Sequence, residues 1–411
     1  MRYITLLALS LLAGCAAAHK SAGTEAPAEK QYAIILSMDA FRWDLADRAH
    51  TPTLDSLKRV GSYAEIYPVY PSNTFPSHYA MATGLHPDHH GVVNNNFYDR
   101  TQQRELSVFN ARDVRIPGFW GGEPIWNTVE RQGLTANIFM WPGSEVPING
   151  RQATLWTRYS DKPSYHERAD WVISAMTRPE EQIPDLVMWY FEQPDAVMHT
   201  YGPASPEAVA QAERIDSVLC YFFREIRRSP VFDRINFIVT ADHGMAELSA
   251  ERCINLRDLL DTTQVVRTVG GNPFGIEVRE EYVDQALRAL RRTGHIRAWR
   301  REKMPSRFHY GSNGERLTNI IALPETGWTL GYSATDQPLR KRGNHGFDNR
   351  DRDMHMVFYG SGPAFREGYT QRSFQNHNMY LLLCRLLGVE PAPNDGDDRA
   401  FGKMLRRSDR K

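Results

Sequence analysis

The stretch YAIILSMDA, residues 32–40, decides the fold prediction, because a continuous apolar run there ends directly at an aspartate. An apolar run of this length is typical of a strand that is buried on both faces of a parallel sheet. The same pattern recurs in DLVMWYFEQPD (residues 185–195), RINFIVTADHG (residues 234–244) and HMVFYGSGP (residues 355–363). We therefore predict four buried parallel strands in an α/β fold.

Helical patterns lie between these runs. Ser205 can cap a helix whose first residue is Pro206, and apolar residues then recur at spacings of three and four up to Ile226. The stretch of residues 122–143 reads as a helix, a glycine turn and a strand. Residues 282–294 form a clear amphipathic pattern. The helix after Ser205 requires no chemistry, so we expect it to pack in the core.

Carboxylates follow the first three apolar runs directly, at Asp39, Asp195 and Asp242. In open α/β sheets, ligands bind at the carboxyl ends of the strands, so these side chains are expected to gather at one edge. His345 instead comes from a loop shortly before the fourth run. The sequence therefore predicts a polar site at the carboxyl edge of the sheet.

Three histidines accompany the three aspartates, and together they could bind two metal ions. His199 stands four residues after Asp195, a spacing that one helical turn could close, and His243 directly follows Asp242. Three ligands for each ion leave open positions for a substrate, as a catalytic site requires. Oxygen and nitrogen ligands without a thiolate suit zinc better than manganese. Any single Asp or His would be weak evidence, so the prediction depends on the whole set.

Five other histidines are assigned to surface positions or hydrogen-bonded core positions. They are His50, His86, His166, His295 and His309.

Thr74 is the candidate nucleophile, in YPSNTFPSHYAMATG, residues 70–84. A threonine hydroxyl is a poor nucleophile unless a metal or base favours its alkoxide. A helix is expected after Pro76, so Thr74 would lie at or just before a helix start, where free amides favour a phosphate. The alternative, that Thr74 only caps the helix, is compatible with a catalytic role.

An asparagine cluster follows in HHGVVNNNF, residues 89–97. A side-chain amide could donate a hydrogen bond to a nonbridging phosphate oxygen. Asn94, Asn95 and Asn96 could each do so, and spacing alone does not choose among them.

Composition limits the classes of protein that fit. The chain has 411 residues, of which 41% are hydrophobic, enough for one large core or two modest ones. Its 49 basic and 49 acidic residues give no net charge, so nothing suggests a surface that wraps a nucleic-acid polymer. The cysteines are Cys15, Cys220, Cys253 and Cys384, without a CxxC pair, which argues against a thiolate zinc site.

The N-terminus predicts export. Arg2 precedes an apolar run over residues 4–12, followed by small residues, which is the signature of a secretory signal peptide over residues 1–15. The order Leu12-Ala13-Gly14-Cys15 resembles a bacterial lipobox. That resemblance implies cleavage before Cys15 and a periplasmic lipoprotein; simple secretion is the alternative. Residues 16–30 are expected to form a flexible tether, and no other apolar stretch could span a membrane.

One catalytic domain is predicted over residues 31–392. Residues 262–343 are interpreted as an inserted subdomain between two parts of the site, and residues 393–411 as a polar C-terminal tail that is not firmly packed.

Four stretches carry a resemblance to a known family. They are NTFPSHYAMATGLHPDHHGVVNNNFYD (residues 73–99), FEQPDAVMHTYGP (residues 191–203), TADHGM (residues 240–245) and GNHGFDNRDRDM (residues 343–354). They resemble the motifs of the nucleotide pyrophosphatase/phosphodiesterase family, the type I phosphodiesterases of the alkaline phosphatase superfamily. The resemblance spans about residues 32–388 and points to a bacterial member.

The resemblance implies an alkaline phosphatase-like fold, a three-layer α/β/α sandwich with a mostly parallel central sheet. It also implies two Zn2+ ions with Thr74 between them, so that Thr74 is itself among the metal-contacting residues. One ion would be held by Asp195, His199 and His345. The other would be held by Asp39, Asp242 and His243.

Substrate contacts are implied in the same way. The phosphate-orienting asparagine of the family falls on Asn95. Phe75 matches the aromatic residue that stacks on a nucleobase, and Tyr159 matches an opposing aromatic of the nucleotide-cleaving bacterial members. Ordinary packing is the alternative for both side chains, and for Tyr159 it explains the residue equally well.

The resemblance implies a zinc-dependent phosphodiesterase or pyrophosphatase that forms a covalent phospho-threonine and releases nucleoside monophosphates. Its partner would be a small nucleotide or another phosphodiester. A phosphodiesterase for phosphocholine lipid headgroups on the same two-metal core is one alternative. A catalytically silent binding protein is another, but it would lack a ligand or the nucleophile, and none is missing.

Overall fold

The computed structural model describes residues 29–332 and 341–406. By its internal contacts the chain divides into residues 1–30 and a folded unit, residues 31–411. The predicted signal peptide, residues 1–15, and nearly all of the predicted tether, residues 16–30, lie outside the described residues.

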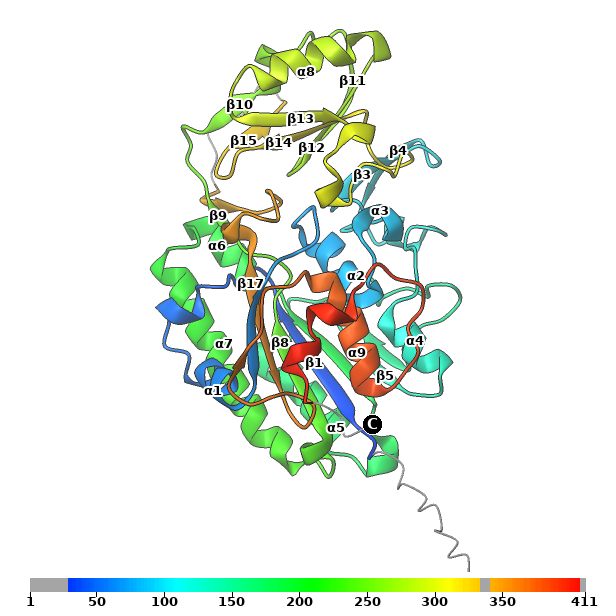
Figure 1. The fold of residues 1–411 in the computed structure, drawn as a ribbon, viewed down its shortest axis with the longest axis vertical. Helices are drawn as coiled ribbons and strands as arrows, with labels where there is room; N and C mark the ends of the chain where they lie inside the picture. The colour runs from blue at the N-terminus through cyan, green and yellow to red at the C-terminus, as the bar shows by residue number, and fades with distance from the viewer. Residues whose placement is uncertain (1–28, 333–340, 407–411) are drawn as a thin grey trace, which may run out of the picture. The chain divides into compact units, whose positions relative to one another are not determined.

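An eight-stranded sheet forms the centre of the folded unit (Figure 1). In spatial order its strands are β18 (Tyr369–Thr370), β2 (Ser62–Ile66), β17 (Met356–Ser361), β8 (Ile235–Thr240), β1 (Tyr32–Met38), β7 (Leu186–Phe191), β5 (Ala136–Phe139) and β6 (Leu155–Thr157). Every residue of β1, β7, β8 and β17 is buried, as the continuous apolar runs predict. The mostly parallel sheet is therefore confirmed.

One strand runs against the others. β1 is parallel to β7 and β8, and β5 is parallel to β6 and β7, but β17 is antiparallel to both β8 and β2. The prediction that β17 is parallel was wrong. An apolar run shows that a strand is covered on both faces, and it carries no information about the direction in which the strand enters the sheet.

Helices cover both faces of the sheet and give the predicted three-layer α/β/α arrangement (Figure 1). One layer contains α1 (Pro52–Val60), α5 (Tyr165–Met176) and α7 (Pro206–Glu225). The other contains α2 (Thr74–Thr83), α4 (Ile125–Arg131) and α9 (Met379–Leu387). Because both faces are covered, the central strands can be apolar throughout.

The helix starts follow local sequence signals. At the start of α7, the Ser205 hydroxyl accepts a hydrogen bond from the Ala208 amide, and Pro206 is the first helical residue, as predicted. α4, Gly133 with φ of 83° and β5 form the predicted helix, turn and strand. In the part of the chain that the structure describes, no helix has the length and apolar character needed to cross a bilayer.

A second, four-stranded antiparallel sheet lies within residues 262–343, of which 333–340 are outside the described residues. Its strands, in spatial order, are β11 (Val265–Val269), β12 (Phe274–Val278), β14 (Ile320–Pro324) and β13 (Ile296–Arg300). The predicted amphipathic helix is α8 (Val283–Arg291), and its buried face contributes to a hydrophobic cluster separate from the main core.

Short elements complete the chain. They are the strand pairs β3 (Asn96–Asp99) with β4 (Arg104–Ser107), β9 (Ala246–Glu247) with β16 (Gly343–Asn344), and β10 (Cys253–Asn255) with β15 (Thr329–Gly331), and the helices α3 (Pro87–His90) and α6 (Asp195–Tyr201).

The C-terminal segment is more ordered than predicted. Within the segment expected to be a polar tail, Phe401 and Met404 are fully buried in the main core. Leu405 is also buried and forms a β-bridge with Phe365, and the Ser62 hydroxyl donates to the carbonyl of Met404. These three apolar side chains are enough to hold the chain against the sheet as far as residue 406.

Candidate active site

The topology brings the three candidate carboxylates to one edge of the sheet. β8, β1 and β7 are adjacent and parallel, so their carboxyl ends lie side by side. Asp39 directly follows β1, Asp242 follows β8 by two residues, and Asp195 begins α6 shortly after β7. Because β17 runs in the opposite direction, the segment that leads into it, which contains His345, also reaches this edge.

The first group of candidate ligands is Asp195, His199 and His345. α6 places Asp195 and His199 one helical turn apart, with Nε2 of His199 3.4 Å from Oδ1 of Asp195. Nε2 of His345 lies 3.6 Å from the same oxygen. Three ligand atoms therefore converge on one point.

The second group is Asp39, Asp242 and His243, all buried. Nε2 of His243 lies 3.2 Å from Oδ2 of Asp242 and 3.4 Å from Oδ1 of Asp39. The two groups adjoin, because the ring of His243 stacks on that of His345 with 3.8 Å between centroids. The structure thus brings all six predicted ligands together in the two sets of three that the family resemblance implies.

The carboxylates present free oxygens to these points. Oδ1 of Asp39, Oδ1 of Asp195 and Oδ2 of Asp242 are buried without a hydrogen-bond partner among the described residues. These are the same atoms that face the imidazole nitrogens. A buried carboxylate oxygen without a donor is costly, and a divalent cation would satisfy it. The donor set therefore fits metal ions.

The imidazole rings are oriented so that Nε2 of each ring faces the candidate metal site. Nδ1 of His243 bonds the Gly244 carbonyl at 2.9 Å, and Nδ1 of His199 bonds the Gly343 carbonyl at 2.7 Å. Nδ1 of His345 bonds Oδ1 of Asn73 at 2.9 Å. An acceptor at Nδ1 places the proton there and leaves Nε2 as a lone-pair donor toward the site.

The buried environment of the site shifts the pKa values of several candidate ligands. Burial, reinforced by the charge of Asp242, raises the pKa of Asp195 to about 8, and burial likewise raises the pKa of Asp39. At Asp242, burial is outweighed by His243 and His78, which bring the pKa to about 2. Burial lowers the pKa of His199 to about 4, with Lys341 adding to the effect. The histidine is therefore neutral near pH 7, the form that binds a metal.

Thr74 is the first residue of α2, three residues earlier than the start of the predicted helix at Ser77. Asn73 occupies the N-cap position, so the Thr74 hydroxyl is not the helix cap. Oγ1 of Thr74 lies 3.3 Å from Nε2 of His243. The hydroxyl therefore lies beside the second ligand group and at a helix N-terminus, where an anion is favoured.

The three asparagines have different environments. The amide oxygen of Asn95 accepts from the Phe75 backbone N–H at 3.2 Å, which turns its NH2 group away from that backbone. Asn94 is buried, and its amide oxygen accepts from Nδ2 of Asn73 and from the Asn95 backbone. Asn96 begins β3 and is exposed. The contacts make Asn95 the asparagine that joins the start of α2.

Two partly exposed aromatic side chains, Phe75 and Tyr159, lie near the candidate site. Phe75 is half-buried, with its ring centroid 5.7 Å from that of Phe109, which is 70% exposed. Tyr159 is 44% exposed and lies 6.3 Å, ring to ring, from Tyr190. The Tyr190 hydroxyl donates to Oδ2 of Asp39 at 2.5 Å, so Tyr159 lies near the second ligand group.

Sequence reasoning missed several supporting residues. His78 is fully buried and one helical turn after Thr74, with Nδ1 2.9 Å from the Thr74 carbonyl and 3.3 Å from Oδ2 of Asp242. That four-residue spacing was a usable signal. Asn73, Asn272 and Tyr190 were also missed, and their contacts lie too far along the chain for spacing to reveal them.

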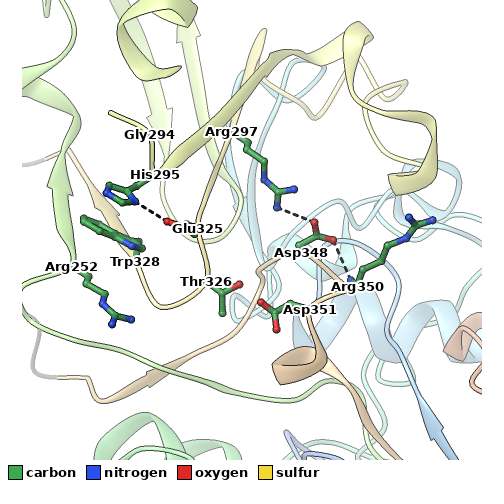
Figure 2. Close-up of a pocket in the computed structure, with 10 residues that line it drawn as sticks. All are labelled: Arg252, Gly294, His295, Arg297, Glu325, Thr326, Trp328, Asp348, Arg350 and Asp351. Carbon is green, nitrogen blue, oxygen red and sulfur yellow. Dashed lines mark hydrogen bonds and ion pairs between the residues drawn. The ribbon is translucent and has the colours of Figure 1, made fainter. Parts of the chain in front are cut away.

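A separate cleft lies away from the six candidate ligands (Figure 2). It has a volume of about 960 Å3, and none of the six candidate ligands is among the described residues that line it. His295 stacks on Trp328 there and bonds Glu325 at 2.7 Å, while Arg297 pairs with Asp348 at 2.9 Å. The hydrogen-bonded position predicted for His295 agrees with this environment.

Two adjoining Asp/His groups beside a threonine hydroxyl, at the carboxyl edge of an α/β/α sheet, form an arrangement typical of two-metal hydrolases. Residues 33–348 match the sequence profile of the family described as type I phosphodiesterase / nucleotide pyrophosphatase. The chain belongs to that family.

Similar proteins include a venom phosphodiesterase of Crotalus durissus collilineatus, 32% identical over 94% of this chain. The chain spans about half the length of that relative, 48%. Human ectonucleotide pyrophosphatase/phosphodiesterase family member 5 is 32% identical over 90% of this chain and 76% of its own length.

Solved structures confirm the alkaline phosphatase-like fold. The murine member 5 structure is similar with a TM-score of 0.85 and 30% identity, covering 92% of this chain and all of that one. A second murine structure is described as an inactive variant, in which a threonine is replaced by alanine, in complex with AMP. It has a TM-score of 0.85 and 29% identity, again covering 92% of this chain and all of that one.

Proposed function

We propose that the protein is a zinc-dependent phosphodiesterase or pyrophosphatase that hydrolyses nucleotide phosphodiester or phosphoanhydride bonds and releases nucleoside monophosphates. The observation that carries this proposal is the position of Oγ1 of Thr74, 3.3 Å from Nε2 of His243, beside two adjoining Asp/His groups. A hydroxyl in this position can act as a nucleophile only if nearby positive charge favours its alkoxide.

Two Zn2+ ions suit the ligand set, because it has oxygen and nitrogen donors and no thiolate. Asp195, His199 and His345 would hold one ion, and Asp39, Asp242 and His243 the other. When bound, the ions would favour the ionised form of an oxygen nucleophile and neutralise charge that develops on the phosphate and the leaving group.

Thr74 would attack phosphorus in line with the leaving group. The Oγ1–P bond forms as the P–O bond to the leaving group breaks, and the hydroxyl proton leaves to solvent. In the second step a water oxygen bonds to phosphorus, the Oγ1–P bond breaks and the Thr74 hydroxyl is restored. Each in-line displacement inverts phosphorus, so the net result is retention of configuration.

The surrounding residues orient the phosphate. The first amide groups of α2 and its dipole favour negative charge beside Thr74. The NH2 group of Asn95 would donate to a nonbridging oxygen, since its amide oxygen is already held by the Phe75 backbone.

A nucleotide is the proposed substrate because two partly exposed aromatic rings, Phe75 and Tyr159, lie near the site. Aromatic faces bind nucleobases by stacking. The AMP complex of the murine relative and its inactive threonine variant are consistent with a nucleotide substrate and with a catalytic threonine.

Export is part of the proposal. Residues 1–15 carry the pattern of a signal peptide with a lipobox-like end at Cys15. A human relative is named an ectonucleotide pyrophosphatase/phosphodiesterase, which agrees with export. We therefore propose a periplasmic protein anchored by an acyl chain on Cys15.

The test compares three p-nitrophenyl substrates with the zinc-loaded protein: the ester of thymidine monophosphate, p-nitrophenyl phosphate and p-nitrophenyl phosphorylcholine. The expected result is that the nucleotide diester has the highest kcat/KM. Dominant turnover of the monoester would overturn the proposal. Dominant turnover of the choline ester would replace it with the lipid-headgroup activity, and no turnover at all would favour a silent binding protein.

A further inference from the structure

The side chain of Asn73 lies at a junction between His345, Asn94 and Asn272. Its side chain is only 5% exposed, and both ends of its amide form hydrogen bonds. Oδ1 accepts from Nδ1 of His345 at 2.9 Å. Nδ2 donates to Oδ1 of Asn94 at 2.8 Å and to the Asn272 carbonyl at 2.7 Å. One buried side chain therefore contacts a candidate metal ligand and two other segments.

Asn94 extends this junction to the phosphate-orienting residue. Its amide oxygen, which accepts from Asn73, also accepts from the Asn95 backbone N–H at 2.8 Å. Asn95 in turn accepts from the Phe75 backbone. The chain of hydrogen bonds thus runs from His345 through Asn73 and Asn94 to Asn95.

Asn272, from a loop of the second sheet, forms a further hydrogen bond to His345. It lies in the loop between β11 and β12 and is 5% exposed. Its Nδ2 donates to the His345 carbonyl at 3.0 Å, while its own carbonyl accepts from Asn73. His345 is therefore held at its backbone by Asn272 and at its ring by Asn73.

The space around this junction is closed. Gly346 has φ of 83°, and a Cβ there would lie 2.4 Å from the Asn272 carbonyl oxygen and 2.6 Å from Oδ1 of Asn73. Only glycine adopts this conformation readily and leaves the two asparagines in place. The residue after His345 is thus fitted to the same two side chains.

We propose that Asn73 and Asn272 are positioning residues that hold His345 in the orientation that binds metal and connect it to Asn95. The proposal rests on the two-zinc site of the proposed function. The second sheet would then contribute directly to the site, because the loop before β12 supplies Asn272, one of the two positioning residues. Hydrogen bonds to a metal-binding histidine typically change metal affinity by about 10- to 100-fold when they are removed.

Asparagine is suited to this position because it has an acceptor for His345 and donors for Asn94 and Asn272. Asn73→Leu loses the acceptor and the donors. The Ser72 carbonyl, 3.1 Å from Nδ1 of His345, is then the remaining acceptor for the imidazole ring. In Asn73→Asp, the acceptor for His345 remains, but the two donors are lost. The two variants therefore distinguish the hydrogen bond to His345 from the hydrogen bonds that lead through Asn94 to Asn95.

The experiment measures zinc affinity by competition with a chelator, together with kcat and KM for the nucleotide ester. In Asn73→Leu, one of two zinc ions should bind at least about tenfold more weakly, while the other is unchanged. In Asn73→Asp, zinc affinity should return most of the way to the wild-type value, while kcat remains below that of the wild-type protein and KM changes little. Asn272→Asp removes the donor to the His345 carbonyl and should weaken the binding of the same zinc ion.

Asn127→Leu is the matched control, because Asn127 is fully buried and donates to the Ile148 carbonyl in another part of the core. It should lower thermal stability without changing zinc affinity or kcat per folded molecule. If Asn73→Leu and Asn272→Asp behave like this control, the two residues are merely structural and the proposal is overturned. If the wild-type protein itself fails to bind two zinc ions, the proposed function fails first.

Discussion

The rings of His243 and His345 stack with their centroids 3.8 Å apart and their planes 18° from parallel. Each histidine belongs to a different ligand group, so this contact joins the two groups into one site. A substrate phosphate placed there would lie within reach of both groups and of Thr74.

Thr74→Ala should abolish most turnover, by roughly 1000-fold or more, because the nucleophile is lost. Zinc stoichiometry should remain two, since six other side chains supply the ligands. The measurement is kcat/KM for the nucleotide ester together with metal content. Thr83→Ala, at the other end of α2, is the control and should keep its activity. Unchanged turnover in Thr74→Ala would disprove the nucleophile assignment.

His345→Ala and His243→Ala should each lower the number of tightly bound zinc ions from two to one. Each variant removes one of three ligands from its group, and a two-ligand set holds a divalent ion poorly. Metal analysis after gel filtration measures the stoichiometry. The exposed His166 provides the control variant, His166→Ala, which should still bind two ions. Two ions in both site variants would rule out the assigned groups.

Metal removal should destabilise the protein more strongly as pH rises. Burial raises the pKa of Asp195 to about 8 and that of Asp39 above its usual value, so both are protonated in the metal-free fold at low pH. A raised folded-state pKa gives stability that is present below the unfolded value of about 4 and is lost as pH rises toward about 8. Bound zinc would remove this loss by pairing with the carboxylates.

The measurement is the free energy of unfolding in denaturant with chelator and with excess zinc, at about pH 5 and about pH 8. The difference between the two conditions should widen at the higher pH. A difference that is equal at both values would mean that these carboxylates do not bind the metal.

Acid should destabilise the fold through two buried histidines, His86 and His377, which lie in a cluster of histidines. His86 stacks on His309 at 4.2 Å and lies 4.5 Å from His377, with His89 and His90 nearby. Burial, with neighbouring histidines adding to it, lowers the pKa of His86 to about 2. Burial also lowers that of His377 to about 4, although the backbone and charge of Asp395 oppose the shift.

A lowered folded-state pKa gives stability that is present above the unfolded value of about 6.5 and is lost as pH falls. The loss should approach about 1.4 kcal/mol per pH unit for each group between about pH 6 and pH 4. His377→Leu should flatten the dependence of unfolding free energy on pH, whereas His50→Gln, at an exposed position, should leave it unchanged.

Phe75→Leu and Tyr159→Leu should raise KM for the nucleotide ester, by about 5- to 100-fold for a lost stacking contact of 1–3 kcal/mol. KM for a phosphodiester without a nucleobase, such as bis(p-nitrophenyl) phosphate, should change much less. Equal effects on both substrates would show that the rings pack rather than bind a base. Trp328→Leu, in the separate cleft, is the control.

The buried strands and the six candidate ligand residues could be picked out from the sequence because each is a local feature, whereas the three layers and the grouping of the ligands were implied by the family resemblance. Apolar runs predict buried strands, and Asp39 and Asp242 follow such runs almost directly. The direction of β17 was not predictable, because both faces of that strand are buried whichever way it runs. The packed C-terminal segment was missed because only Phe401, Met404 and Leu405 anchor it among polar residues.

The supporting residues were out of reach for a different reason. Asn73 and His345 are 272 residues apart in the chain, and Asn73 and Asn272 are 199 apart. Both asparagines read locally as turn residues, so their shared role becomes visible only when the second sheet and the segment before β17 come together. In contrast, His78 lies four residues after Thr74 on the same helix and could have been inferred.

The position of His345, late in the sequence and shortly before β17, sets the order in which the two ligand groups can form during synthesis. The second ligand group is complete once the ribosome has made residue 243, but the first group still lacks His345, which arrives about a hundred residues later. A nascent or truncated chain that ends before residue 345 can therefore assemble only one ligand group. Both candidate ligand groups can therefore be complete only after residue 345 has been made.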